Sequence, residues 1–79
     1  MKTTQEIQEL QLAVSAQLSA LPPTDEYGYP TDEEREEMES ILRNLECYLL
    51  EGDCADESVQ SWLDGSDEYF IEDFFLGER

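Results

Sequence analysis

The sequence predicts an all-α domain, a small bundle of three to four helices, from three observations. Apolar residues recur at helical spacing over residues 3–21 and again over 31–51. Pro22-Pro23 follows the first stretch and Gly52 follows the second, and both kinds of residue commonly end helices. The chain has 79 residues and 39% hydrophobic content, which suits one small core. We therefore expect a single acidic helical domain over residues 1–79.

The first expected helix begins at Thr3, because Thr3 and Glu6 have the spacing of a capping box. It carries one apolar stripe, made of Ile7, Leu10, Val14, Leu18 and Leu21. The opposite side carries few charges and consists of Gln5, Leu12, Ala16 and Ala20. Such a helix is expected to contact neighbours on both sides, either as the central helix of the fold or as the seam of a homodimer.

A loop around Gly28 and Pro30 precedes the second expected helix. Thr31 and Glu34 repeat the capping-box spacing, and acidic residues fill the first turn, where the helix dipole favours them. The apolar residues that follow share a narrow arc of a helical projection: Met38, Ile41, Leu42, Leu45, Tyr48 and Leu49. This pattern predicts an amphipathic helix that ends at Gly52.

A shorter third helix is expected to start near Asp53 or Cys54 and to stop at Gly65. Its expected buried residues are Ala55, Val59, Trp62 and Leu63.

Residues 67–76 form the last segment, which Ser66 is expected to cap. Two pairs spaced four residues apart, Phe70/Phe74 and Ile71/Phe75, favour a helix, whereas residues 69–71 alone also fit a short strand. Since a chain of this size needs its aromatics inside, we expect Phe70 and Phe74 to join Trp62 in the core.

Net charge is the strongest functional signal in the sequence. Twenty-one acidic residues stand against four basic ones, there is no histidine, and the formal net charge is −17. Only Glu6 and Glu9 precede residue 25, so nineteen of the twenty-one acids fall within residues 25–79. A surface this acidic repels nucleic acid and anionic membranes, and it attracts a strongly basic partner through fast, salt-sensitive association.

Several kinds of chemistry are excluded or disfavoured. Without histidine there is no Ser-His or Cys-His nucleophile, and the only lysine, Lys2, is expected at a frayed end. No phosphate-binding glycine loop occurs, and calcium loops started at Asp53 or Asp64 lack the required glycine and final glutamate. Cys47 and Cys54 do not make a typical zinc site. We expect no enzyme activity, no cofactor and no metal.

The compartment follows from what the sequence lacks. The N-terminus has no apolar signal core, and the longest uncharged stretch, residues 10–24, is too short and polar to cross a bilayer. We expect a cytoplasmic protein. Two cysteines in a chain without an export signal are more often free thiols than a disulfide.

The expected partner-binding surface combines the outer face of the second helix with the acidic loop before it and the acids near the C-terminus. Residues four apart on a helix are about 6 Å apart along the axis, which is comparable to phosphate spacing along a DNA strand. Tyr27 and Tyr29, beside carboxylates, suit an arginine that stacks and forms ion pairs. The expected residues are Asp25, Glu26, Tyr27, Tyr29, Asp32, Glu33, Glu36, Glu37, Glu39, Asp64, Asp67, Glu68, Glu72 and Asp73.

In size, in charge, in expected helicity and in the acids of residues 25–73, the chain resembles small acidic inhibitors encoded by phages and mobile elements. These include anti-restriction and anti-CRISPR proteins that imitate DNA. The resemblance implies a stoichiometric inhibitor that occupies the basic channel of a nuclease or CRISPR surveillance complex, in the host cytoplasm if a phage encodes it.

Two alternatives remain open. The chain is also similar to the acidic four-helix immunity proteins that neutralise nuclease bacteriocins, which implies a nuclease inhibitor that need not cover the DNA channel. The other alternative is an acidic adaptor that docks on a protein groove through the first helix or through the aromatic residues of 67–76.

Overall fold

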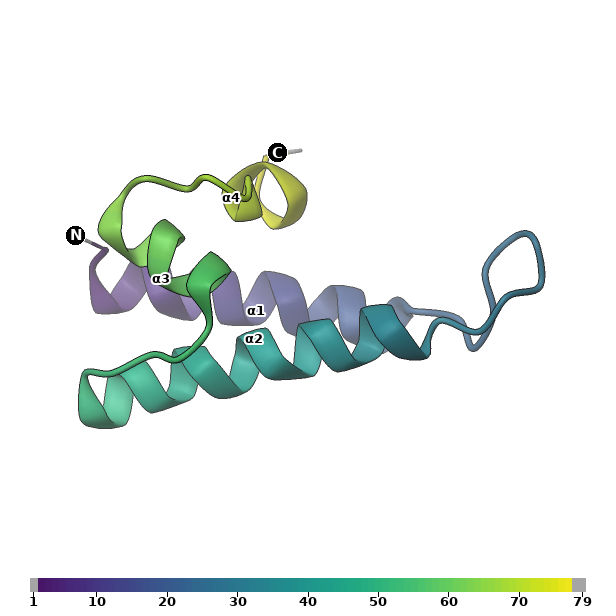
Figure 1. Ribbon diagram of the computed structural model, residues 1–79, viewed down its shortest axis with the longest axis horizontal. Helices are drawn as coiled ribbons and strands as arrows, with labels where there is room; N and C mark the ends of the chain where they lie inside the picture. The colour runs from purple at the N-terminus through teal and green to yellow at the C-terminus, as the bar shows by residue number, and fades with distance from the viewer. Residues whose placement is uncertain (1, 78–79) are drawn as a thin grey trace.

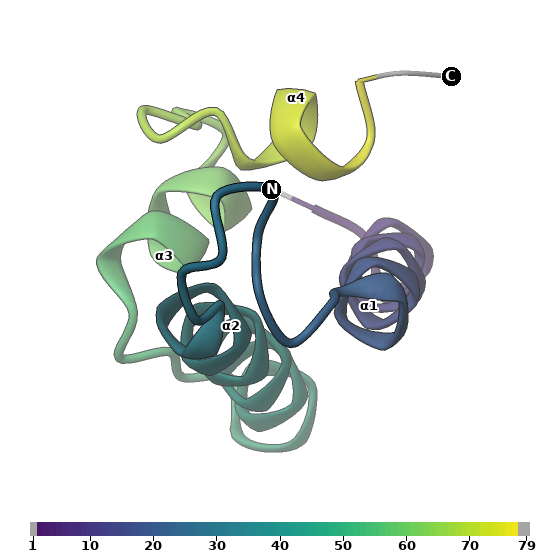
Figure 2. The ribbon, with the colours of Figure 1, turned by 90° about the vertical axis from the view of Figure 1, so that its right-hand side faces the viewer.

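The computed structural model describes residues 2–77, and over this range the protein is an all-α bundle, as the sequence predicts. Its helices are α1 (Thr4–Ala20), α2 (Asp32–Glu51), α3 (Glu57–Asp64) and α4 (Ile71–Phe75). The two long helices, α1 and α2, run antiparallel side by side, and α3 and α4 lie across one side of this pair (Figure 1). Contacts join α1 to α2, α2 to α3, α3 to α4, and α4 back to α1. The four helices therefore close around one core, as the end-on view shows (Figure 2).

The core takes a stripe from each helix, and the stripes of α1 and α2 are those that the spacing of apolar residues predicts. Its buried side chains are Ile7, Leu10, Val14, Met38, Ile41, Leu45, Val59, Trp62, Leu63 and Ile71. Leu18, Leu42, Tyr48 and Leu49 pack against this core from its edges. Trp62 is the largest fully buried side chain, so α3 is anchored at the centre of the bundle by one aromatic ring.

The start of α1 is confirmed in detail. The Thr3 hydroxyl accepts a hydrogen bond from the Glu6 amide (3.1 Å), and the Glu6 carboxylate accepts one from the Thr3 amide (3.3 Å). Gly52 (φ 76°) and Gly65 (φ 91°) end α2 and α3 in the left-handed conformation, which explains why glycine stands at both positions.

The capping box predicted for α2 is wrong. Thr31 is 4% exposed and makes no side-chain bond to the helix; its hydroxyl donates instead to the carbonyl of Pro22. The Thr31 amide also donates to the Pro23 carbonyl (3.2 Å). Thr31 is still the N-cap residue of α2, because its carbonyl accepts a hydrogen bond from the Arg35 amide (3.0 Å), but its side chain is used to hold the prolines that follow α1.

The third helix starts later than expected. The Asp56 carboxylate accepts hydrogen bonds from the amides of Ser58 (2.9 Å) and Val59 (3.3 Å), which fixes Asp56 as the N-cap and Glu57 as the first helical residue. Ala55 therefore precedes the helix and is exposed, so the prediction that Ala55 is buried is wrong.

The last segment is a helix rather than a strand, but Asp67, not Ser66, caps it. The Asp67 carboxylate accepts hydrogen bonds from the amides of Ile71 (2.8 Å) and Glu72 (3.3 Å). Ile71 points into the core, whereas Phe70 and Phe74 are 65% and 66% exposed. The prediction that both phenylalanines join the core is wrong, because this one short turn can bury a single face and Ile71 occupies it.

Candidate functional site

The predicted carboxylates of α2 lie on its solvent face. Asp32, Glu33, Glu36, Glu37 and Glu39 are all exposed, because the opposite stripe of the helix packs into the core. Contacts with α1 and α3 hold the helix, so these carboxylates project from a rigid element. The structure thus places this part of the predicted surface where a partner can reach it.

Neighbouring cations do not neutralise this face. Over residues 2–77, the ion pairs are all made by Lys2, which contacts Glu6 at 3.9 Å and Glu72 at 3.2 Å. Arg43 follows Glu39 by four residues, a spacing that favours ion pairing, yet the pair does not form in the described part of the chain. Arg79 lies outside the described residues. The α2 carboxylates therefore make no ion pair within residues 2–77.

The tyrosine loop extends past one end of the α1–α2 pair (Figure 1). Tyr27 and Tyr29 are 77% and 69% exposed. One oxygen of the Asp25 carboxylate accepts hydrogen bonds from the amides of Tyr27 (2.8 Å) and Tyr29 (3.0 Å), and Gly28 takes a left-handed turn between them. Asp25 therefore shapes the loop, while Glu26 and the tyrosine rings remain available for contact.

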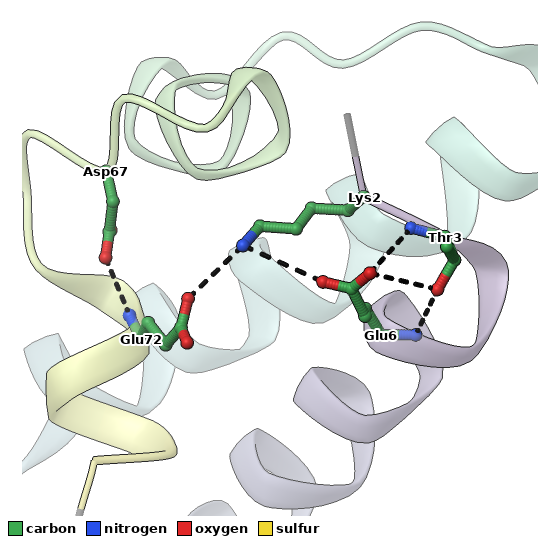
Figure 3. A network of polar contacts seen from close by, with 5 residues as sticks. All are labelled: Lys2, Thr3, Glu6, Asp67 and Glu72. Carbon is green, nitrogen blue, oxygen red and sulfur yellow. Dashed lines mark hydrogen bonds and ion pairs between the residues drawn. The ribbon is translucent and has the colours of Figure 1, made fainter.

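The C-terminal acids divide between structural and exposed positions. Asp67 is half-buried and caps α4, and Glu72 is held by Lys2, so neither carboxylate is uncommitted (Figure 3). Asp73 is exposed. Asp64 and Glu68 border a shallow depression of about 370 Å³ beside α3.

This depression adds two acids that the sequence analysis did not select, Asp56 and Glu57. The sequence analysis started the third helix near Asp53 or Cys54 and so placed both residues inside it, whereas the structure places them at the N-terminus of α3.

The predicted partner-binding residues form separate groups on the molecule. The tyrosine loop lies beyond one end of the long helices, whereas α3 and the turn after it lie over the other half (Figure 1).

A groove between α2 and the α3–α4 segment was also not predicted. It has a volume of about 260 Å³ and is lined by Glu34, Glu37, Met38, Ile41, Ser58, Tyr69, Ile71, Phe74 and Phe75. Hereafter these residues are called the α2–α4 groove. It escaped sequence analysis because Phe74 was assigned to the core and Glu34 to a helix cap.

The second face of α1 is not covered by the rest of residues 2–77. Gln5, Leu12, Ala16 and Ala20 are exposed, and Leu12 is 72% exposed. Within residues 2–77 the helix contacts α2 and α4 and no other helix. It is therefore not enclosed on both sides, and a homodimer through this face stays a prediction.

Thiols and metal ligands offer little chemistry. Cys47 and Cys54 are free and half-buried. Burial raises the pKa of the Cys54 thiol, hydrogen bonding by the Asp56 backbone lowers it, and the nearby carboxylates of Asp56 and Asp53 raise it further. Among residues 2–77 no three cysteine or acidic side chains lie close enough to hold a metal ion.

None of the described helices is both long enough and apolar enough to cross a membrane. No known protein family, curated protein or solved structure matches this chain.

Proposed function

We propose that this protein is a stoichiometric inhibitor that mimics DNA and occupies the basic nucleic-acid-binding channel of a bacterial defence effector. The observation that carries the proposal is the exposed row of carboxylates on α2, which no cation of the described chain neutralises. A net charge of −17 opposes folding by self-repulsion, and a basic partner would relieve that cost.

The spacing of the row supports mimicry. Asp32, Glu36 and Glu39 follow one another on the solvent side of α2, with steps of about 4.5–6 Å along the helix axis. Phosphates of one DNA strand rise about 3.4 Å per charge and are also displaced around the duplex. Arginines and lysines that would bind phosphates then bind carboxylates, through the same charge-assisted hydrogen bonds.

The tyrosine loop supplies a second contact in this proposal. Tyr27 and Tyr29 present exposed rings beside Glu26, on a loop whose shape Asp25 already fixes. A preformed loop loses little conformational entropy on binding. An arginine of the target can stack on either ring while it pairs with a neighbouring carboxylate.

The mechanism is competition, with no reaction catalysed and no cofactor. Targets of this chemistry are nucleases and CRISPR surveillance complexes, and the protein would act in the cytoplasm, of the host if a phage encodes it. The inhibitor and the nucleic acid would exclude each other from one channel, so inhibition should be overcome by excess DNA.

The test is a pull-down from bacterial lysate with the purified protein at low salt, followed by elution with NaCl or, in parallel, with excess duplex DNA. The proposal expects one basic nucleic-acid-binding protein to be released by both. A nuclease that stays bound while it binds DNA would instead indicate an immunity-type inhibitor, and a partner that survives both elutions would contradict DNA mimicry.

A matched pair of variants assigns the effect to the row on α2. Glu36→Gln with Glu39→Gln removes two charges from the row, whereas Glu9→Gln with Glu51→Gln removes two exposed charges elsewhere. Because each contact pairs a charged donor with a carboxylate, the first pair should weaken binding by about tenfold or more. Equal losses for both pairs would show that only the net charge matters.

A further inference from the structure

We infer that the α2–α4 groove is a docking site for a segment of a partner protein that presents an apolar side chain next to a lysine or arginine. The inference does not rest on DNA mimicry, because the groove uses other side chains than the row Asp32, Glu36 and Glu39.

The groove has an apolar floor and two unlike walls. Met38, Ile41 and Ile71 form the floor and are 7%, 3% and 4% exposed. Glu34 and Glu37 form the wall on the α2 side. The lining residues of α2 run from Glu34 to Ile41, a length of about 10 Å, or two helical turns. Tyr69 and Phe74 form the opposite wall and are 54% and 66% exposed.

The aromatic wall is held in place before any partner arrives. Asp67 caps the helix that carries Phe74, and the Gln17 side chain donates a hydrogen bond from α1 to the Phe74 carbonyl (3.3 Å). The rings of Phe74 and Phe75 meet edge to face, with 4.9 Å between their centres. A preformed apolar wall in water favours a partner, since covering it gains about 25 cal/mol per Å² without a large ordering cost.

Size and charge define the occupant. A volume of about 260 Å³ lies below the roughly 300–1,000 Å³ of sites that enclose small organic ligands, so the groove suits one or two side chains of a protein. A cation beside the apolar anchor would lie between the carboxylates of Glu34 and Glu37 and the faces of Tyr69 and Phe74. A second copy of this chain is disfavoured, because it also carries a net charge of −17.

The probe is a synthetic 14-residue peptide of leucine and lysine whose leucines form one helical stripe. Its control is an isomer with the same residues shuffled so that the leucines surround the helix. Binding is measured by fluorescence anisotropy at 0.3 M NaCl, where diffuse attraction between exposed charges is screened. We expect the striped peptide to bind at least about tenfold more tightly than its isomer.

Two matched pairs of variants locate the binding. Phe74→Ser should weaken binding of the striped peptide by about tenfold, whereas Leu50→Ser, at a residue 76% exposed outside the groove, should change it less than about twofold. Glu34→Gln with Glu37→Gln should weaken it more than Glu33→Gln with Glu36→Gln, although both pairs remove two exposed charges from the same helix.

Four outcomes would overturn the inference. Equal affinity for the two peptides, or equal losses in the two charge variants, would show that attraction to the acidic surface is diffuse. A groove filled by a second copy would appear as a dimer of the unliganded protein that Phe74→Ser dissociates in analytical ultracentrifugation. Amide chemical-shift changes that avoid Ile41 and Ile71 would place the peptide elsewhere.

Discussion

The ammonium group of Lys2 lies over the ring of Trp62, 4.9 Å from the ring centre. The same nitrogen is 3.2 Å from the Glu72 carboxylate and 3.9 Å from that of Glu6 (Figure 3). Lys2 thereby joins the first residues of the chain to α3 and α4 and covers the largest buried side chain of the core. Lys2 is one of only four basic residues, and its contacts hold the bundle together.

Replacing Lys2 should therefore destabilise the fold. Lys2→Met keeps an unbranched apolar stem but removes the contacts to Trp62, Glu6 and Glu72. Because both carboxylates are about half exposed and screened by water, we expect a loss of about 1 kcal/mol in the free energy of unfolding, measured in urea. Arg43→Met, which removes an exposed cation without an ion pair among residues 2–77, is the control. Equal losses in both variants would mean that only net charge counts.

Lys2 also shows where sequence analysis stops. The apolar stripes of α1 and α2 predicted the residues that these two helices bury, because each stripe repeats over several turns and leaves one possible buried face. The expectation of a frayed end for Lys2 was wrong, since the stripes contain no information about which distant residues meet. The contact between Lys2 and Glu72 spans 70 positions and exists only after α4 packs on α1.

The candidate site also has a part that the sequence predicted and a part that it did not. The solvent face of α2 was predicted, because it is the complement of the buried stripe. The α2–α4 groove was not, because it depends on how a five-residue helix is capped. Asp67 and Phe70 both have positive φ, at 44° and 57°, and these two turns decide that Ile71 rather than Phe74 enters the core. Neither position is a glycine, so the sequence gives no sign of these left-handed conformations.

The excess of negative charge predicts that salt stabilises this protein. Raising NaCl from 20 to 500 mM screens repulsion among exposed carboxylates, and we expect the free energy of unfolding to rise by about 1 kcal/mol, or about 5 °C in Tm. The variant Glu36→Gln with Glu39→Gln should start more stable at low salt and gain less from NaCl. A Tm that falls with salt would show instead that ion pairs, such as those of Lys2, dominate the electrostatics.

The buried hydroxyl of Thr31 should matter more than its position in a loop suggests. Thr31→Val has nearly the same shape but leaves the Pro22 carbonyl without its hydrogen bond, so we expect a loss of about 1–2 kcal/mol in thermal or urea unfolding. Thr31→Ser keeps the hydroxyl and should retain most of the stability. If Thr31→Ser loses the stability that Thr31→Val retains, the methyl group of Thr31 rather than its hydroxyl is what the site requires.

The Cys54 thiol predicts a loss of stability in alkaline solution. Burial raises its pKa in the folded protein above the ordinary value of 9.0, and the Asp56 and Asp53 carboxylates add to the rise. A folded state that holds its proton more tightly than the unfolded chain is favoured below the unfolded pKa, and this advantage disappears as pH rises through the folded pKa. The free energy of unfolding of the native protein should therefore fall more steeply above about pH 9 than that of Cys54→Ser. Cys47→Ser, which also removes one half-buried thiol but leaves Cys54 in place, should keep the steep decline. Parallel urea-unfolding curves for the native protein and Cys54→Ser from pH 7 to pH 10.5 (roughly the range over which thiols ionise) would contradict the prediction.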